Sequence, residues 1–325
     1  MEDGFGRTID YLRISVTDRC NLRCRYCMPP EGVERIPHEE LLTLEEIYRV
    51  VRVLSEAGIA KVRLTGGEPL VRKNLIRLIS ELHELTGIKE IGMTTNGVLF
   101  GEQAAGLATA GLTGVNISLD TLSPHTFLKI TGYDLQEKVL QAVDAALNQG
   151  LRVKINCVPC KEFNEEDLPA LALLAREKDI DVRFIELMPV GCGQQYHGIP
   201  SDQALIRLEG QYGKATPCPE HRGNGPARYY SFEGFRGKIG FISPMSHKFC
   251  SECNRIRLTA EGRLKLCLNY HYGLELKPLL RKGASDGEIL GAVEDALLHK
   301  PREHDFQHMA EAQDCEQRKM VQIGG

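Results

Sequence analysis

The chain has 325 residues, of which 42% are hydrophobic and 26% are charged, and its formal net charge is −4. This length suits one large domain or two ordinary ones, and this composition can fill a sizeable core. The acidic balance argues against wholesale nucleic-acid binding. The sequence contains no apolar run of about 18 residues, so we predict no membrane span.

The start of the chain and its cysteines indicate the compartment. The first residues, MEDGFGR, lack the basic and apolar regions of a secretory signal peptide. Eleven cysteines in such a chain are more typical of metal ligands and free thiols than of disulfides. We therefore expect a cytoplasmic protein with no membrane or nucleic-acid partner.

The first half of the chain alternates short strands with helices. Strands are predicted over residues 9–17, 61–65, 90–95, 114–120, 151–158 and 181–188. Helices are predicted between them over residues 43–58, 73–86, 101–110, 123–130, 135–149 and 165–178. This alternation predicts parallel β/α units connected in the right-handed sense.

Polar residues occupy every second position in several of these strands, as in Arg13, Ser15 and Thr17. A strand that is buried on both faces of an open sheet should be nearly all apolar. One polar face therefore favours an α/β fold in which six units form an incomplete (β/α)6 barrel with a wet lumen. The alternative is an open, flavodoxin-like sheet. In β/α barrels the active site lies at the C-terminal ends of the strands.

The pattern changes after Pro189. A Gly- and Pro-rich stretch follows, and the sequence patterns beyond it are weaker. They predict helices over residues 201–209, 274–281 and 285–299 and strands over residues 229–232, 238–243, 255–259 and 263–268. The end of the chain, residues 300–325, is predicted to be irregular. We expect a smaller α+β domain over residues 190–325 that closes the open side of a barrel formed by residues 1–189.

Two groups of three cysteines have metal-ligand spacing. Cys20, Cys24 and Cys27 follow the first strand as C-x3-C-x2-C. Iron–sulfur clusters are held by thiolates, usually four, so three would leave one iron open to a small molecule. The alternatives are a fragment of a structural zinc site or three unrelated thiols.

The second group comprises Cys250, Cys253 and Cys267, which a hairpin can bring together. Here zinc is a serious alternative, because His247 or His271 could complete a Cys3His site. Local spacing alone leaves the choice between zinc and an iron–sulfur cluster open.

The first spacing, with Tyr26 before the last cysteine, resembles the radical S-adenosylmethionine (SAM) superfamily. The chain as a whole resembles one branch of it, the GTP 3′,8-cyclases (MoaA) of molybdenum cofactor biosynthesis. The stretches that carry this resemblance are LRISVTDRC (12–20), CRYCMP (24–29), RLTGGEPL (63–70), MTTNG (93–97), NISLD (116–120), RFIELM (183–188), FCSECNRIRL (249–258) and the terminal Gly324 and Gly325.

The resemblance implies a homodimer with two [4Fe–4S] clusters that face each other across the barrel. The first cysteine group would hold the cluster that binds SAM, and the second would hold an auxiliary cluster that meets the guanine of GTP. The residues implied in SAM binding are Tyr26, Gly66, Gly67, Glu68, Ser118 and Met188. Without the resemblance, Ser118 reads as an ordinary strand residue and Met188 as core filler.

A triphosphate requires several cations, and Arg can bind phosphate in a bidentate manner. The substrate residues that follow from the resemblance and from strand alternation are Arg13, Lys61, Arg63, Thr94, Lys154, Arg183, Arg255, Ile256 and Arg257. Any one of the cations could instead be a solvated surface charge, but a cation inside a barrel strand needs a partner.

The implied reaction is that of a lyase in which the cofactors, and no catalytic side chain, generate the radical. An external one-electron reductant would start SAM cleavage, and the 5′-deoxyadenosyl radical would take hydrogen from C3′ of GTP. The product, 3′,8-cyclo-7,8-dihydro-GTP, would pass to a cyclic pyranopterin monophosphate synthase. The terminal Gly324 and Gly325 resemble a flexible tail that reaches into the site.

Two other functions are weighed against this one. The first is a radical SAM enzyme that uses its auxiliary cluster to modify a peptide, and the second is a non-catalytic zinc module that binds nucleic acid. We interpret Cys157 and Cys160 as free thiols. The sequence assigns no role to Cys192, Cys218 and Cys315.

Overall fold

The computed structural model of the protein describes residues 1–220, 222–308 and 314–324. Its centre is one twelve-stranded sheet with the order β12-β11-β10-β1-β2-β3-β4-β5-β6-β9-β8-β7. The strands are β1 (Tyr11–Ser15), β2 (Lys61–Thr65), β3 (Glu90–Thr95), β4 (Gly114–Ser118), β5 (Arg152–Cys157), β6 (Asp181–Ile185), β7 (Thr216–Cys218), β8 (Arg228–Ser231), β9 (Ile239–Ile242), β10 (Arg255–Leu258), β11 (Arg263–Lys265) and β12 (Gly273–Glu275).

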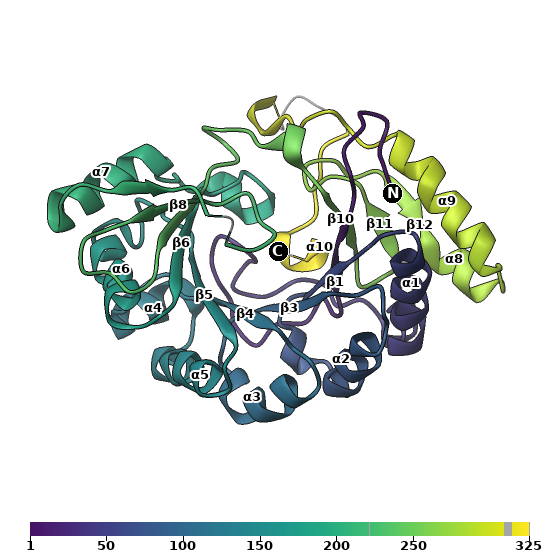
Figure 1. Ribbon diagram of the computed structural model, residues 1–325, viewed down its shortest axis with the longest axis horizontal. Coiled ribbons are helices and arrows are strands. Elements are labelled where there is room, and N and C mark those ends of the chain that lie inside the picture. Colours follow the sequence, from purple (N-terminus) through teal and green to yellow (C-terminus); the bar gives the residue numbers. More distant parts are fainter. Residues whose placement is uncertain (221, 309–313, 325) are drawn as a thin grey trace.

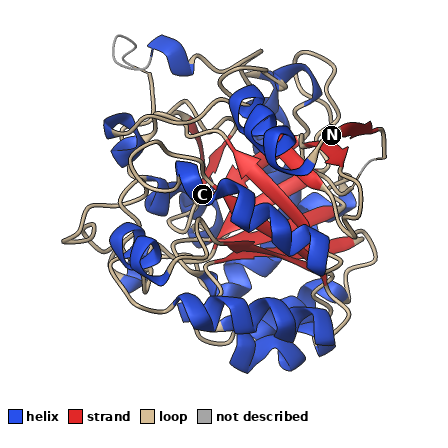
Figure 2. Cartoon of the chain, turned by 90° about the vertical axis from the view of Figure 1, so that its left-hand side faces the viewer, coloured by secondary structure: helices blue, strands red, loops and turns tan. Residues whose placement is uncertain are grey.

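The helices lie on the outer side of this curved sheet, except for the short α10 near the C-terminus, which lies inside it, and the strands face a common interior (Figures 1 and 2). They are α1 (Leu44–Glu56), α2 (Leu75–His83), α3 (Phe100–Thr109), α4 (Pro124–Thr131), α5 (Gln136–Asn148), α6 (Leu168–Glu177), α7 (Ser201–Tyr212), α8 (Leu276–Arg281), α9 (Asp286–Leu298) and α10 (Met320–Ile323). In the part of the chain that the structure describes, no helix is long and apolar enough to cross a membrane.

The strand order confirms the incomplete barrel. Strands β1 to β6 follow one another in sequence order and run parallel, while β12 and β7 are the two unpaired edges. A flavodoxin-like sheet reverses its strand order at a switch point, so that alternative is wrong. Apolar residues such as Leu12, Ile14 and Leu64 are fully buried in the core, and the alternating polar residues face the lumen.

Strands from the second half of the chain continue the same sheet on both sides. β10 pairs in parallel with β1, and β9 pairs in parallel with β6. The antiparallel strands β11 and β12 extend one end, and β8 and β7 extend the other. The sheet therefore has no break at residue 189, and the boundary between two domains there stays a prediction.

N-terminal capping residues explain where several helices begin. Thr43 and Glu46 form a reciprocal capping box at the start of α1, and Ser285 and Glu288 form another at α9. At α4, Ser123 caps the N-terminus. Such caps satisfy backbone N–H groups that the helix leaves unpaired.

Among the strands and α-helices of the described residues, three short elements differ from the sequence prediction. Strands β7 and β12 have three residues each and were not predicted, and β12 occupies the predicted start of the following helix. The expectation of an irregular end is wrong at α10, which has four residues. Elements this short are stabilised by pairing or packing against distant parts of the chain, so no local periodicity marks them.

Candidate active site

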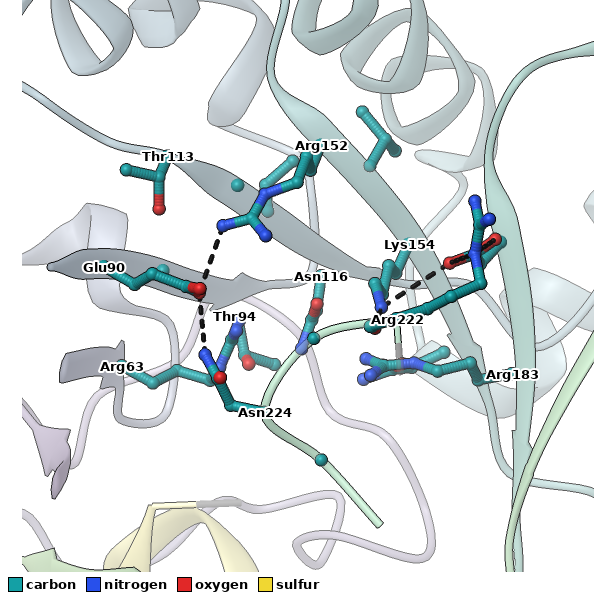
Figure 3. A pocket seen from close by; sticks show the side chains of 18 of the residues that line it. Arg63, Glu90, Thr94, Thr113, Asn116, Arg152, Lys154, Arg183, Arg222 and Asn224 are labelled. Carbon is teal, nitrogen blue, oxygen red and sulfur yellow. Dashed lines mark hydrogen bonds and ion pairs between the residues drawn. The ribbon is translucent and has the colours of Figure 1, made fainter. Parts of the chain in front are cut away.

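The lumen of the barrel holds a cavity of about 680 Å³ that is lined by cations. Strand register places Arg257, Arg13 and Arg63 side by side on β10, β1 and β2. Arg13, Arg63 and Arg255 line the cavity. Lys154 and Arg183 line it from β5 and β6 (Figure 3). Five of the nine predicted substrate residues are therefore cations that line the cavity, and a sixth cation, Arg257, lies beside Arg13 on the neighbouring strand.

Burial and mutual repulsion lower the pKa values of three of these cations. Burial and then the charge of Arg257 lower the pKa of Arg13 well below its ordinary value. Burial and then Arg255 lower the pKa of Arg257 to about 10. Burial and then Arg183 lower the pKa of Lys154 to about 8. Like charges this close are costly without a counterion, so the lumen is arranged for an anion.

Neighbouring groups hold these cations in place. The guanidinium of Arg63 donates from Nε to the Tyr11 hydroxyl at 2.6 Å and from Nη1 to the Met93 carbonyl at 3.0 Å. A Cβ at Gly92 would lie 2.7 Å from the same guanidinium, so glycine makes room for it. Arg183 donates from Nε to the Asn156 side-chain oxygen at 2.9 Å.

Oγ1 of Thr94 and Nε of Arg255 are buried in the cavity wall and have no hydrogen-bond partner among the described residues. A buried polar atom without a partner costs about 1–3 kcal/mol. Both residues were predicted to bind substrate, and both are free to contact a ligand.

Two predicted substrate residues lie elsewhere. The Lys61 ammonium pairs with the Asp10 carboxylate at 2.8 Å and does not line the cavity. The side chain of Ile256 is fully buried in the hydrophobic core. Their assignment as substrate residues stays a prediction.

The first cysteine group lies in the loop that leaves the C-terminal end of β1. Burial, then the neighbouring Cys27 and Cys20 thiols, raise the pKa of Cys24 well above its ordinary value. Burial, then Cys20, raises the pKa of Cys27 to about 12. The Cys20 sulfur accepts hydrogen bonds from Leu22 N at 3.4 Å and from Asn96 Nδ2 at 3.8 Å. The three thiols are thus electrostatic neighbours whose thiolate forms need a cation.

The fit of these thiols to a metal centre depends on its size. No three Cys, His, Asp or Glu side chains within the described ranges converge closely enough to hold one metal ion. A single zinc ion requires sulfurs within about 2.3 Å of the metal, whereas a four-iron cluster spreads its thiolates over the corners of a cube. The donor set of three neighbouring thiols fits the cluster better than the ion.

The loop after β2 packs tightly against the loop of the first cysteine group. Gly67 N donates to the Thr17 carbonyl at 2.9 Å. A Cβ at Gly66 would lie 2.6 Å from the Thr17 carbonyl oxygen, and one at Gly67 would lie 2.4 Å from that of Arg19. Glycine is therefore required at both positions for contact between the two loops, whether or not a ligand binds.

Glu68 and Tyr26 also have protein partners. The buried Glu68 carboxylate accepts from Thr95 Oγ1 at 2.8 Å and from Asn96 N at 2.7 Å, and burial raises its pKa to about 7. The Tyr26 hydroxyl donates to Asp120 at 2.7 Å. The contacts of Glu68 fix the loop after β2 to the end of β3, and the contact of Tyr26 fixes the cysteine loop to the segment after β4.

The two other predicted SAM residues lie at neighbouring strand ends. Ser118 is the last residue of β4 and is half-buried. Met188 follows β6 and packs against a small buried cluster that includes Val190 and Ile323. Both therefore lie at the C-terminal side of the barrel, where the first cysteine group lies.

The second cysteine group lies at the opposite ends of the strands. Cys250 and Cys253 precede β10, and Cys267 follows the antiparallel β11. Although burial alone raises the pKa of Cys253, the charges of Lys300 and then Arg255 outweigh it, and the pKa is lowered. A lowered pKa favours the thiolate, the form that ligates metal.

The two histidines considered for a zinc site each have one contact through Nδ1. His247 is exposed and its Nδ1 contacts Ser246 Oγ at 3.0 Å. His271 is exposed and its Nδ1 contacts the Asp314 carbonyl at 2.9 Å. Both contacts use Nδ1 and leave Nε2 available to a ligand, so these contacts do not decide between zinc and a cluster.

The C-terminal tail, residues 314–324, enters the lumen. The Gly324 carbonyl accepts from Arg257 Nη1 at 2.9 Å, and a Cβ at Gly324 would lie 2.9 Å from Thr65 Oγ1. The backbone N–H of Val321 donates to the Cys27 thiol. The expectation that the tail reaches the site is confirmed for Gly324, and Gly325 lies outside the described residues.

A buried ion pair anchors this tail. The Lys265 ammonium on β11 contacts the Glu316 carboxylate, and both side chains are almost fully buried. Arg318 donates from Nε to the same carboxylate at 3.0 Å. The pair joins the tail to the sheet before the tail turns into the barrel.

Glu316→Ala should lower the free energy of unfolding by about 3–5 kcal/mol, because it leaves the Lys265 ammonium buried without its carboxylate. Anaerobic urea unfolding followed by circular dichroism measures this loss. Removing both charges in Lys265→Met/Glu316→Leu should cost less. Glu165→Ala, which breaks a half-exposed pair with Arg207, should cost under about 1 kcal/mol. Equal losses in Glu316→Ala and Glu165→Ala would contradict the anchoring role.

The sequence did not identify several residues of the cavity wall. Strand alternation marks Asn116 and Asn156 as lumen-facing, yet neither was assigned a role. Tyr11, Glu90 and Arg152 also line the cavity. A loop over residues 222–226 covers it, and only its glycine and proline content distinguishes this loop in the sequence.

Comparison with known proteins matches two family models to consecutive parts of the chain. The model of the radical SAM superfamily matches residues 14–175, and the model "Molybdenum Cofactor Synthesis C" matches residues 180–306. Curated proteins named GTP 3′,8-cyclase are similar over the full length of both chains. Those of Clostridium perfringens (strain 13 / Type A), Desulforamulus reducens and Syntrophomonas wolfei are 45%, 46% and 48% identical, each with 100% of both chains covered.

The solved structures of Streptococcus suis SuiB share the fold. SuiB bound to the precursor peptide SuiA has a TM-score of 0.63 at 16% identity, covering 97% of this chain and 76% of that chain. SuiB bound to S-adenosylmethionine has a TM-score of 0.62 at 15% identity, covering 94% and 75%.

Proposed function

Because this chain belongs to the GTP 3′,8-cyclases of the radical SAM superfamily, enzymes of molybdenum cofactor biosynthesis, we propose which of its residues hold GTP, SAM and the clusters. The activity of the family is the conversion of GTP to 3′,8-cyclo-7,8-dihydro-GTP. Full-length similarity to these cyclases weighs against both a peptide-modifying enzyme and a zinc module that binds nucleic acid.

The cationic cavity is the observation that carries the assignment of the substrate site. Burial and then repulsion between neighbouring arginines depress the pKa values of Arg13 and Arg257, and the several negative charges of GTP would offset both. The residues proposed to bind GTP are Arg13, Arg63, Thr94, Lys154, Arg183, Arg255 and Arg257, with Lys61 and the backbone of Ile256 at the edge of the site.

The first cysteine group is proposed to hold the [4Fe–4S] cluster that binds SAM. When bound, the cluster and SAM would supply the radical chemistry that removes the hydrogen at C3′ of GTP. The protein residues bind and orient. Gly66, Gly67 and Glu68 shape the loop for the SAM amino group, while Tyr26, Ser118 and Met188 line the same end of the barrel.

The second cysteine group is proposed to hold an auxiliary [4Fe–4S] cluster. Cys250, Cys253 and Cys267 lie at the N-terminal ends of the strands, so the two groups flank the lumen from opposite ends. A nucleotide with its guanine toward the auxiliary cluster would place its ribose near SAM. Residues 1–189 would then hold SAM, and residues 190–325 the auxiliary cluster and the guanine end of GTP.

The proposed partners rest on the family. They are an external one-electron reductant, a second copy of the chain in a homodimer, and a cyclic pyranopterin monophosphate synthase that takes the product. The need to keep free thiols and clusters reduced supports a cytoplasmic location.

Anaerobic reconstitution with iron and sulfide, followed by SAM, reductant and each nucleoside triphosphate in turn, tests the function. Mass analysis should find a cyclised product with GTP alone, together with methionine and 5′-deoxyadenosine. Product from ATP at the same rate, or no cyclised nucleotide while SAM is cleaved, would contradict the proposal.

The affinity for GTP should fall as the pH rises from 7 to 9. The Lys154 ammonium has a pKa of about 8, so it is charged below that pH and neutral above it. Its loss removes one charge-assisted bond and should raise the KM for GTP about three- to tenfold. Lys154→Arg, which stays charged, should give a flat profile. SAM cleavage measured in the same samples is the control. If the KM for GTP depends on pH in the same way in the wild type and in Lys154→Arg, the role of Lys154 is contradicted.

A further inference from the structure

A short loop crosses the mouth of the cavity at the N-terminal ends of the strands. It comprises residues 222–226, here named the strap, and lies in the connection between β7 and β8. All five of its residues line the cavity. Figure 3 shows the strap passing in front of the cations, from Arg222 beside β5 and β6 to Asn224 near β3.

The strap is fastened on both sides of this mouth. Asn224 Nδ2 donates to Oε2 of Glu90, the first residue of β3, at 2.7 Å, and Arg152 pairs with the same oxygen at 3.0 Å. On the other side, Arg222 Nε donates to Asp181, the first residue of β6, at 3.1 Å. Side-chain contacts therefore hold the strap against the strands on both sides of the cavity mouth.

The strap is in direct contact with the cations that face it. The Lys154 ammonium donates to the Arg222 carbonyl and, at 2.9 Å, to the Tyr229 hydroxyl. A Cβ at Gly223 would lie 3.2 Å from the same ammonium, and one at Gly225 would lie 4.0 Å from Arg183 Nη1. A carbonyl oxygen thus occupies a position on Lys154 that a phosphate oxygen could take.

The backbone N–H groups of Gly223, Asn224 and Gly225 make no hydrogen bond to any other described residue. Consecutive backbone N–H groups in a glycine-rich turn are a recurrent way of binding phosphate. Gly223 has a φ of +104°, which L side chains rarely adopt. The strap therefore offers donors at the edge of a cavity that already has a surplus of positive charge.

We propose that the strap is a phosphate-binding cover: it closes over the terminal phosphate of the nucleotide and donates backbone N–H groups to it, so that the site prefers triphosphates to monophosphates. This inference rests on the proposed function. With guanine toward the second cysteine group beside β10, the far end of the nucleotide would reach toward Lys154 and Arg183 on β5 and β6. Those are the residues that the strap covers.

The test compares GTP, GDP and GMP binding by calorimetry to the reconstituted enzyme under anaerobic conditions. Asn224→Ala removes the latch to Glu90 and should weaken GTP binding about three- to tenfold, the effect of losing an ordered hydrogen-bonded contact. Affinity for GMP and for SAM should be unchanged. Glu90→Gln keeps an acceptor for Asn224 and should have a smaller effect, while the exposed Asn148→Ala should have none.

Hydrogen–deuterium exchange gives a second readout that an ordinary loop would not show. Exchange at residues 223–225 should slow when GTP is added and stay unchanged with GMP. Equal losses of GTP and GMP affinity in Asn224→Ala, or exchange that GTP does not slow, would overturn the role of the strap. A wild-type enzyme that binds none of the three nucleotides would instead overturn the proposed function.

Discussion

Arg255→Ala and Arg257→Ala should each retain SAM cleavage but form less than about a tenth of the cyclised nucleotide. Each change removes a buried guanidinium from the lumen, and a hydrogen bond to a charged group contributes about 1.5–3 kcal/mol. Arg255 has a buried Nε with no partner among the described residues, and Arg257 already holds the Gly324 carbonyl. The second variant should therefore also release the tail.

The measurement is the ratio of cyclised nucleotide to 5′-deoxyadenosine in a single reaction, with iron content recorded for every variant. A matched control is Arg236→Ala, because Arg236 is exposed and, among the described residues, donates a hydrogen bond only to the Glu177 carbonyl. Its ratio should equal that of the wild type. Parallel loss of cyclisation and SAM cleavage with intact clusters would show that these arginines do not act through GTP.

Cys267→Ala should remove about four of about eight irons per chain and abolish cyclisation, since a four-iron cluster held by three thiolates does not survive with two. SAM cleavage should persist, because the first cysteine group lies at the other end of the barrel. Iron and sulfide analysis after anaerobic purification, together with electron paramagnetic resonance of the reduced protein, measures both clusters.

Cys218→Ala is the matched control for this experiment. Cys218 is half-buried on β7, outside both cysteine groups, and its replacement should leave the iron content unchanged. An unchanged iron count in Cys267→Ala, with a loss of one zinc, would instead favour the zinc alternative that the spacing left open.

Much of the barrel was predictable because its signals are local. Each of the first six strands combines an apolar face with a polar one, and caps such as Thr43 with Glu46 mark helix starts within four residues. The same alternation identified Arg13, Arg63 and Lys154 as lumen-facing. Strand neighbours in an incomplete barrel follow sequence order, so these residues were expected to meet.

The rest depends on contacts between distant segments. Strand alternation places Lys61 beside Arg63, but it cannot show that Asp10 pairs with Lys61. The latch between Asn224 and Glu90 joins residues 134 apart, and no local pattern marks either one. The Lys265–Glu316 pair likewise joins a strand to a tail whose composition predicts only irregular structure.

The continuous sheet has a consequence for how the protein is made. The segment leading into β1 is held by a residue 244 positions later, since Asn254 Nδ2 donates to Asp10 Oδ1 at 2.7 Å, and β10 itself pairs along β1. While the ribosome is still translating the middle of the chain, β1 has an open edge, and β6 has one until β9 emerges. Such edges can pair with other nascent chains. We expect newly synthesised protein to depend on chaperones until residue 258 has left the exit tunnel.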